Sequence, residues 1–415
     1  MIQTDTKNAT FTEQIDAWII AAIGGGVSTF PGLVHSLPGV FPVDILDRVS
    51  RLAMAGIISR EVSMRFQGSA RSPSLPFHKV LRCTLPVPHA LDFEWRFSLS
   101  ARKRLAELCL SLGKRIVCLG TPSVFAELDR RAGSDRCAFV DRNSASLQAF
   151  STMSSGRVIR CDCLRDPVPN IVGDVIVADP PWYTDFLDGF LWMAAQLCQV
   201  DGRVILSLPP EGTRPDAKAE VAHFLKRASG LGFRVEMLEE NSLPYETPHF
   251  EENVFFRSGI HCDLSDWRRG SLAILKKTET RRGDRPLAPP EESWDEICLY
   301  GTRIKIRTSA RDQGVNPALI PLIDRNVLGS VSRSDPLRCQ ARVWTSGNRV
   351  FGCECPILLF DLLNTMSPEL KFRERPDHQR MRVRPRGPGL VHLAVGQIHH
   401  IASLEQRERQ GVGCG

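Results

Sequence analysis

The sequence predicts an α/β fold in which a doubly wound parallel sheet carries helices on both faces. Residues 174–178 form a short, β-branched apolar run that stops at Asp179, because Pro180 and Pro181 cannot donate hydrogen bonds to a sheet. Apolar runs alternate with segments of helical periodicity from 114 to 276, the order expected of β/α units. Continuous rather than alternating hydrophobicity indicates strands that are buried on both faces, as in a parallel sheet.

The individual elements of this sheet follow from hydrophobic periodicity. Helices are predicted at 101–112, 186–198 and 217–229, with a further helix opening at Val124. The predicted strands cover 116–119, 137–140, 158–161, 174–178, 202–208, 233–238 and 271–276. Open α/β sheets bind ligands at the carboxyl ends of their strands, so we expect Asp179 to lie at a ligand-binding edge.

At 415 residues the chain is too long for one ordinary domain. A winged-helix-like module is predicted at 1–66 and a Ser/Pro/Gly-rich linker at 67–88. The α/β domain is predicted at 89–280, followed by a charged linker at 281–294 and a basic, β-containing extension at 295–415.

The N-terminal segment shows the winged-helix pattern. Helical periodicity at 12–23, 28–34 and 43–55 is followed by 56–62, which resembles a strand that enters a hairpin. This arrangement places three arginines where they can contact nucleic acid: Arg48, Arg51 and Arg60. The alternative is that the module packs against the α/β domain or a partner protein, and both interpretations stay open because the module is not strongly basic.

Composition is typical of a globular protein, with 42% hydrophobic and 24% charged residues. No apolar run reaches the ~20 residues of a membrane span, and no charged-then-apolar leader opens the chain. The 13 cysteines are scattered, mostly within apolar runs, which indicates buried, reduced thiols. We therefore expect a cytoplasmic protein without a membrane partner.

The net charge of +6 is concentrated in the C-terminal third. Residues 281–415 contain 21 Lys and Arg against 15 Asp and Glu, a difference of +6. The segment 371–386 alone contains seven basic and two acidic residues. This segment is either an arm that contacts phosphates or a solvated tail.

The residues after the 174–178 run are suited to holding an amine. The ionised Asp179 side chain and the Pro180 carbonyl can both accept hydrogen bonds from one NH₂ group, because Pro181 keeps the backbone before it extended. Two such acceptors orient the lone pair of the amine towards an electrophile. Trp182 or Tyr183 offers a flat face on which a base can stack.

This Asp-Pro-Pro-Trp-Tyr sequence resembles the D/N-P-P-Y/F/W motif of S-adenosylmethionine-dependent amino methyltransferases. Those enzymes methylate adenine N6, cytosine N4, glutamine or lysine. With Trp95-x-Phe97 and the Gly120-Thr121-Pro122-Ser123 turn, the chain is more closely similar to the N6-adenine methyltransferase group, which also includes elongation-factor lysine methyltransferases. The similarity covers roughly residues 90–210 and implies a Rossmann-like class I methyltransferase sheet.

The resemblance implies S-adenosylmethionine as cofactor and methylation of an amine, most of all adenine N6 of DNA or RNA, with a protein substrate as an alternative. It places Asp179, Pro180, Pro181 and Trp182 at the target amine, and Tyr183 at the substrate. It places Gly120, Thr121 and Asp141 at the cofactor, with Trp95 and Phe97 flanking the cofactor pocket. Independently, Asp141 and Asp162 each follow a predicted strand, where an acid can bind ribose hydroxyls or the adenine amine.

Two other functions stay open. A winged helix before such a domain is also similar to the branched-chain polyamine synthases, which transfer an aminopropyl group to an amine. Those enzymes carry G-D-D-D where this chain has Gly120-Thr121-Pro122-Ser123. The departure from G-x-G at this turn also admits a non-catalytic module that binds nucleic acid or assembles with other proteins.

The C-terminal extension gives weaker signals. Strands are predicted at 297–307 and in a hairpin at 342–351 that turns at 346–348. Four residues are candidates for a zinc site: Cys339, Cys353, Cys355 and His378. Their spacing is not that of zinc motifs and their neighbours are apolar, so no metal is expected.

Overall fold

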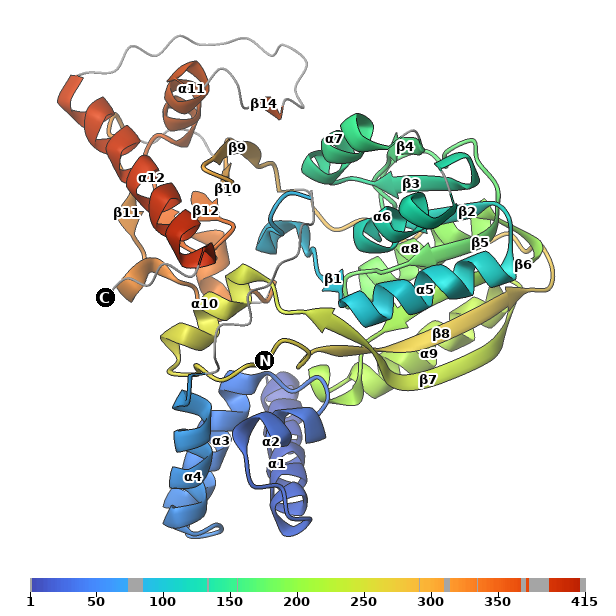
Figure 1. The fold of residues 1–415 in the computed structure, drawn as a ribbon. Coiled ribbons are helices and arrows are strands. Elements are labelled where there is room, and N and C mark those ends of the chain that lie inside the picture. Colours follow the sequence, from blue (N-terminus) through green and yellow to red (C-terminus); the bar gives the residue numbers. More distant parts are fainter. Residues whose placement is uncertain are drawn as a thin grey trace. The chain divides into compact units, whose positions relative to one another are not determined.

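The computed structural model describes residues 2–73, 85–132, 134–154, 156–290, 292–309, 314–333, 335–366, 371–372 and 388–410. These residues form two compact units (Figure 1). The large unit contains the described residues up to 73 together with 95–247 and 258–289. The small unit contains 85–94, 248–257 and the described residues from 290 to 410. Within these ranges, no helix is both long and apolar enough to cross a membrane.

Four helices open the large unit: α1 (Ile2–Gly24), α2 (Phe30–Ser36), α3 (Pro42–Met54) and α4 (Arg60–Arg71). Side-chain caps fix the starts of two of them. The Thr29 hydroxyl accepts the N–H of Gly32 at the start of α2, and the Ser59 hydroxyl accepts the N–H of Val62 at the start of α4. The helices bury a common apolar core: Ile19, Phe30, Leu33, Ile45, Val49, Leu52 and Phe66.

The expected strand at 56–62 is wrong, and the winged-helix module is not confirmed. The β-branched residues Ile57, Ile58 and Val62 favour a strand by propensity alone. Instead, Gly56 adopts a φ of +71° just after α3. Ser59 then caps α4, which begins at Arg60. Helix formation is favoured here because residues 63, 66 and 70 then lie buried on one face.

The helical module packs against the rest of the large unit. The ring centroids of Phe41 and Trp267 are 5.9 Å apart, and the Glu211 carboxylate accepts a 3.2 Å hydrogen bond from the Gln14 amide. The N–H of His261 donates to the Ala70 carbonyl at 2.7 Å. These contacts support the alternative in which the module packs against the α/β domain.

An eight-stranded sheet forms the body of the large unit, in the order β1-β7-β8-β6-β5-β2-β3-β4. Its strands are β1 (Arg96–Phe97), β2 (Ile116–Leu119), β3 (Cys137–Asp141), β4 (Arg157–Arg160), β5 (Gly173–Ala178), β6 (Cys198–Leu208), β7 (Phe233–Glu246) and β8 (Arg269–Lys277). Every strand expected in this region is present. The sheet is mixed rather than parallel throughout, because β8 runs antiparallel to β6 and β7, and β1 runs antiparallel to β7.

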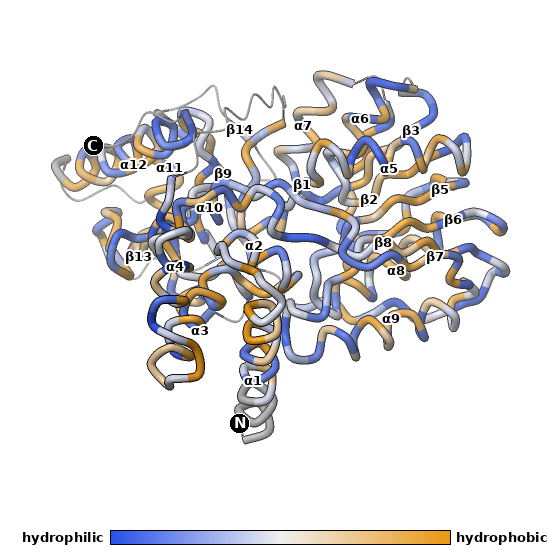
Figure 2. Tube along the Cα trace, turned by 60° about the horizontal axis from the view of Figure 1, so that its bottom comes forward, coloured by the Kyte–Doolittle hydropathy of each residue, from blue (hydrophilic) through white to orange (hydrophobic). Residues whose placement is uncertain are grey.

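Helices cover both faces of this sheet: α5 (Leu99–Leu112), α6 (Pro122–Ala132), α7 (Ser144–Met153), α8 (Thr184–Leu197) and α9 (Ala217–Gly230). The chain moves outwards from β2 to β4 in one direction and from β5 to β7 in the other. Right-handed crossovers therefore place α6 and α7 on one face, and α8 and α9 on the opposite face (Figure 1). The central strands are strongly hydrophobic, as Figure 2 shows for β5, β6 and β8. The order in which strands are added to the sheet thus reverses between the neighbouring strands β2 and β5.

The small unit contains a six-stranded antiparallel sheet in the order β11-β13-β12-β10-β9-β14. Its strands are β9 (Asp295–Leu299), β10 (Thr302–Ile306), β11 (Ile320–Pro321), β12 (Val343–Thr345), β13 (Val350–Gly352) and β14 (Lys371–Phe372). Its longer helices are α10 (His249–Arg257), α11 (Pro356–Met366) and α12 (Pro388–Arg409). The expected hairpin at 342–351 is confirmed, whereas the expected strand at 297–307 is itself a hairpin that turns at 300–301.

A buried ionic cluster lies within the small unit. The Arg303 side chain is 1% exposed and contacts Asp92 at 2.5 Å, Glu296 at 2.6 Å and Glu94 at 3.5 Å. Lys305 pairs with Asp92 and Glu296 as well. Burial disfavours the guanidinium charge, but Asp92 and Glu296 outweigh it and raise the pKa of Arg303. The arginine thus joins the 85–94 segment to the β9–β10 hairpin.

Removal of this arginine is expected to destabilise the small unit. Arg303→Ala leaves the Asp92, Glu94 and Glu296 carboxylates without their shared cation, which should cost about 3–5 kcal/mol of unfolding free energy. Urea unfolding of the full chain measures the loss. Arg407→Ala, an exposed position on α12, is the matched control and should change stability by less than about 0.5 kcal/mol. Equal effects of both variants would contradict this role.

Candidate active site

The carboxyl ends of β2 and β5 lie side by side in the large unit, at the point where the strand order reverses. These strands pair in parallel, with Leu119 opposite Ala178, so Gly120 and Asp179 emerge side by side. Gly120 has a φ of +65°, and a Cβ there would lie 2.9 Å from the Phe190 ring. Only glycine fits this turn, which lies at the carboxyl edge of the parallel strands, where α/β sheets bind their ligands.

Asp179 ends a short hydrogen-bond chain. The Tyr245 hydroxyl, from the end of β7, donates to Asp179 Oδ1 at 2.5 Å. The same hydroxyl lies 2.7 Å from Ser207 Oγ on β6, which can donate to it in turn. Among the described residues, Asp179 Oδ2 has no hydrogen-bond partner, and neither has the Pro180 carbonyl. Two acceptors at the carboxyl end of β5 therefore have no partner within the described part of the chain.

The environment of Asp179 shifts its ionisation. Burial raises the pKa of Asp179 to about 7, against the lowering effects of the Tyr245 hydrogen bond and the Arg268 charge. Burial and the adjacent Asp179 carboxyl raise the pKa of Tyr245 well above its ordinary value. The phenol therefore stays protonated and acts as the donor, while Asp179 can gain or lose a proton near neutral pH.

Aromatic rings surround this chain. Phe97 stacks on Tyr245 with ring centroids 4.7 Å apart, while Trp95 and Trp182 meet Tyr245 edge to face. The Arg268 guanidinium carbon lies 4.2 Å from the Trp95 ring centroid and 4.3 Å from that of Trp182. Trp182 is 6% exposed and Phe97 is 2% exposed, so neither presents an open face to a ligand. The flat platform expected at Trp182 is covered.

The residues expected at the cofactor lie along the same edge. Thr121 is 1% exposed, and its hydroxyl donates to the Val177 carbonyl at 3.4 Å, so its side chain joins β2 to β5. Asp141 follows the body of β3, and its Oδ1 accepts the N–H of Asn143 at 2.9 Å. Because β3 adjoins β2, Asp141 lies one strand away from the Gly120 turn.

Asp162 lies one strand further out, beyond β4, and its carboxylate is held by its own loop. Oδ1 accepts the N–H of Leu164 at 2.8 Å, and Oδ2 accepts a 3.1 Å hydrogen bond from Arg165. Asp162 therefore stabilises its own turn, in addition to the cofactor-binding role predicted for it.

Tyr183 lies at the start of α8, where the N–H of its backbone donates to the Pro181 carbonyl at 2.7 Å. Its ring is partly exposed and lies 5.9 Å from the guanidinium carbon of Arg214. This position beside Trp182 is consistent with contact to a substrate.

Three residues of the site were not predicted from sequence: Ser207, Tyr245 and Arg268. Ser207 is the one hydroxyl residue in an otherwise apolar stretch, which is the signal that could have identified it. Tyr245 is one of only three tyrosines but follows no motif. Their proximity to Asp179 depends on the β6-β8-β7 arrangement, which no local pattern specifies.

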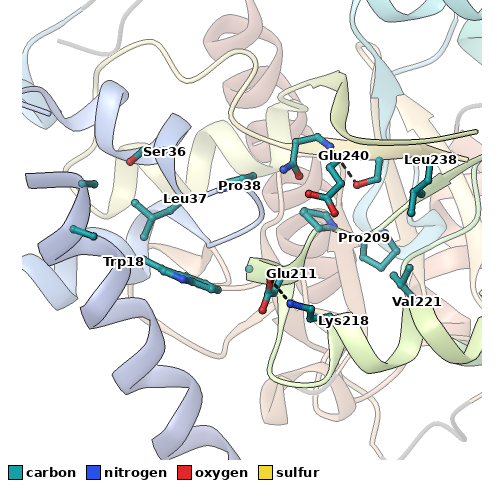
Figure 3. A pocket seen from close by; sticks show the side chains of 16 residues that line it. Trp18, Ser36, Leu37, Pro38, Pro209, Glu211, Lys218, Val221, Leu238 and Glu240 are labelled. Carbon is teal, nitrogen blue, oxygen red and sulfur yellow. Dashed lines mark hydrogen bonds and ion pairs between the residues drawn. The ribbon is translucent and has the colours of Figure 1, made fainter. Parts of the chain in front are cut away.

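A separate cleft of about 570 Å³ lies between the helical module and the β6–α9 side of the large unit (Figure 3). Trp18, Pro209, Glu211, Lys218 and Glu240 are among the residues that line it. No residue of the Asp179 cluster does. The sequence-predicted site residues therefore belong to a different region from this cleft.

The candidate metal-binding cysteines do not form a metal-binding cluster in the described part of the chain. Cys353 and Cys355 are buried and Cys339 is exposed, while His378 lies outside the described residues. Among the described residues, no group of three or more His, Cys, Asp or Glu side chains is arranged to hold a metal ion.

No family model and no curated protein matches the sequence. Among solved structures, the chain is similar to the branched-chain polyamine synthase C9 mutein from Thermus thermophilus, in complex with N4-aminopropylspermidine and 5'-methylthioadenosine. This match has a TM-score of 0.52 and 12% sequence identity, and covers 69% of this chain and 95% of that chain. At this identity the likeness shows a shared α/β fold.

Two further similar structures are methyltransferases. A TehB-like SAM-dependent methyltransferase from Corynebacterium glutamicum gives a TM-score of 0.31 at 15% identity, covering 43% of this chain and 89% of that chain. The N-methyltransferase NodS from Bradyrhizobium japonicum, in complex with S-adenosyl-l-homocysteine, gives a TM-score of 0.31 at 9% sequence identity. This match covers 43% of this chain and 87% of that chain.

The raised pKa of Asp179 predicts a pH-dependent stability difference. In the unfolded chain this carboxyl titrates near pH ~4, whereas in the native state its pKa is about 7. Between these values the native state binds more protons, so the contribution of Asp179 to stability is lost as pH rises through this window. Asp179→Asn removes that loss, and its stability relative to the unmodified chain should improve from pH 4 to pH 8.

Urea unfolding at the two pH values measures this change. The control is Asp201→Asn, the same substitution at a side chain that is 77% exposed and lies outside the Tyr245–Asp179 hydrogen-bond chain. A constant difference for Asp179→Asn would show that Asp179 titrates normally.

Proposed function

We propose that this chain is an S-adenosylmethionine-dependent methyltransferase that methylates an amine, with adenine N6 of DNA or RNA as the acceptor. The observation that carries the proposal is the pair of acceptors at the carboxyl end of β5, Asp179 Oδ2 and the Pro180 carbonyl, beside the Gly120 turn. An NH₂ group that donates to both acceptors has its lone pair directed away from them. The Asp-Pro-Pro-Trp motif supports an amine acceptor, and the resemblance to the N6-adenine methyltransferase group favours adenine.

The Gly120 turn fits a nucleoside cofactor. Because Gly120 carries no side chain, a ligand can approach the backbone of this turn closely, next to the N-terminus of α6. Gly120 and Thr121 would hold the methionine end, and Asp141 would bind the ribose hydroxyls. When bound, S-adenosylmethionine supplies a methyl group that is activated for transfer to a nucleophile.

The chain's own residues then contribute position and proton transfer. Tyr245 and Ser207 fix the Asp179 carboxyl, so that the amine is oriented before it reacts. Asp179 holds one N–H of the amine through Oδ2. With a pKa of about 7, it can accept the proton that the methylated amine releases, and the Tyr245 hydroxyl keeps its own proton meanwhile.

Aminopropyl transfer to an aliphatic amine is a second candidate. The same pKa of about 7 suits a base that must deprotonate an ammonium group, which adenine does not require. The likeness to the polyamine synthase fold extends over 95% of that chain. The turn Gly120-Thr121-Pro122-Ser123 contains no acid for an aminopropyl nitrogen, and this difference favours methyl transfer. A lysine side chain of a protein is an acceptor of the same aliphatic class.

Replacement of Asp179 is expected to abolish transfer without loss of the cofactor. Asp179→Ala removes one of the two amine acceptors and the proton acceptor, so tritiated-methyl transfer to adenine-containing DNA or RNA should fall about 10²–10⁴-fold. Calorimetry should show S-adenosylhomocysteine binding unchanged. Asp201→Asn, at an exposed position within β6, should retain full transfer. Full activity of Asp179→Ala would exclude the proposed site.

Replacement of Asp141 is expected to affect the cofactor instead. Asp141→Ala removes the acid proposed to bind the ribose hydroxyls, and S-adenosylhomocysteine should bind at least about tenfold more weakly. Calorimetric titration measures the loss, and Asp141→Asn tests whether hydrogen bonding without charge is sufficient. If S-adenosylhomocysteine bound neither variant nor the unmodified chain, titration with decarboxylated S-adenosylmethionine would decide for the second candidate.

A further inference from the structure

Arg268 occupies a position that the proposed reaction leaves unexplained. It immediately precedes β8, and its guanidinium carbon lies within 4.3 Å of the ring centroids of both Trp95 and Trp182. Trp182 belongs to the Asp-Pro-Pro-Trp motif, directly after the residues that would hold the amine. A planar cation of the chain itself therefore covers the aromatic surface beside Asp179.

A planar acceptor needs the same surface. Nucleobases and guanidinium groups both bind the faces of indole rings, so they compete for one location. Trp182 retains only 6% exposure with Arg268 in place. An acceptor base can stack on it only if the guanidinium moves away.

We propose that Arg268 is the specificity-determining residue of the acceptor site: its guanidinium fills the space against Trp95 and Trp182, and a planar acceptor must displace it to reach Asp179. This inference rests on the proposed function. The space selects for flat, polarisable groups, because those alone replace the stacking that the guanidinium provides. A flexible aliphatic ammonium group has no flat face and replaces less of this stacking.

The construction of the site permits this exchange. The Arg268 carbonyl accepts the N–H of Tyr245 at 2.9 Å, so the backbone can stay in place while the partly exposed side chain, with its four rotatable bonds, changes rotamer. Displacement also changes Asp179. The positive charge of Arg268 lowers the pKa of this carboxyl, so its departure makes Asp179 a stronger base when the acceptor arrives.

Binding of 2'-deoxyadenosine to protein saturated with S-adenosylhomocysteine tests the proposal by calorimetry. Arg268→Ala should bind the nucleoside about tenfold more tightly than the unmodified chain, because the competing occupant is gone. Arg268→Met, which keeps the length of the side chain without its planar charge, should bind with intermediate affinity. Arg269→Ala is the matched control, because Arg269 contacts no aromatic ring among the described residues, and should bind as the unmodified chain does. Equal or weaker binding by Arg268→Ala would overturn the proposal.

Ethylguanidinium separates failure of this inference from failure of the proposed function. As a free surrogate of the missing group, it should raise the thermal unfolding midpoint of Arg268→Ala and not that of the unmodified chain or Arg269→Ala. If ethylguanidinium raises the midpoint of Arg268→Ala but the protein does not bind S-adenosylhomocysteine, the proposed cofactor is rejected. The inference that Arg268 fills the space against Trp95 and Trp182 is then retained. Cofactor binding with neither nucleoside gain nor ethylguanidinium effect would reject the role of Arg268 and retain the proposed function. Because the Arg268 charge lowers the pKa of Asp179, the acidic limb of the kcat/KM profile should lie at higher pH for Arg268→Ala than for the unmodified chain. An acidic limb at the same pH in both proteins would also contradict the proposal.

Discussion

The hydrogen bond from Tyr245 to Asp179 is the interaction on which the candidate active site depends. It joins the end of β7 to the end of β5, although β8 and β6 lie between these strands in the sheet. Ser207 on β6 completes the connection at the intervening strand. A buried carboxyl without such a partner would lose its orientation, and the amine acceptors would lose their fixed geometry.

The antiparallel strand β8 makes this connection possible. It pairs with β6 on one side and β7 on the other, and the segment that leads into it supplies Trp267 and Arg268. Trp267 packs on Phe41 of the helical module and on Trp95, so an aromatic series extends from the module to the surroundings of Asp179. The module therefore has a structural relation to the site whether or not its arginines contact nucleic acid. Arg48 and Arg51 are already paired with Asp16 and Asp47.

The two units are stabilised in different ways. Apolar side chains from β2, β5, β6, α8 and α9 form a continuous core in the large unit. The small unit has its own apolar core between its sheet and α11 and α12, and adds the buried cluster around Arg303. Because a buried ion pair needs defined partners, this cluster specifies how the 85–94 segment lies on the β9–β10 hairpin. Apolar packing alone would specify this less strictly.

The sequence by itself determined the strands, their carboxyl ends and the residues that follow them. Hydrophobic runs depend on local composition, and proline and glycine act on their own backbone, so Asp179, Pro180, Gly120 and Asp141 could be located without a structure. The strand expected at 56–62 was wrong because the Ser59 cap and the tertiary burial of Phe66 outweigh β-propensity. Only the tertiary structure decided the direction of β8, the partners of Asp179 and the position of Arg268 over Trp182. These features join segments more than 60 residues apart, and no periodicity in a single chain segment specifies which distant side chains will meet.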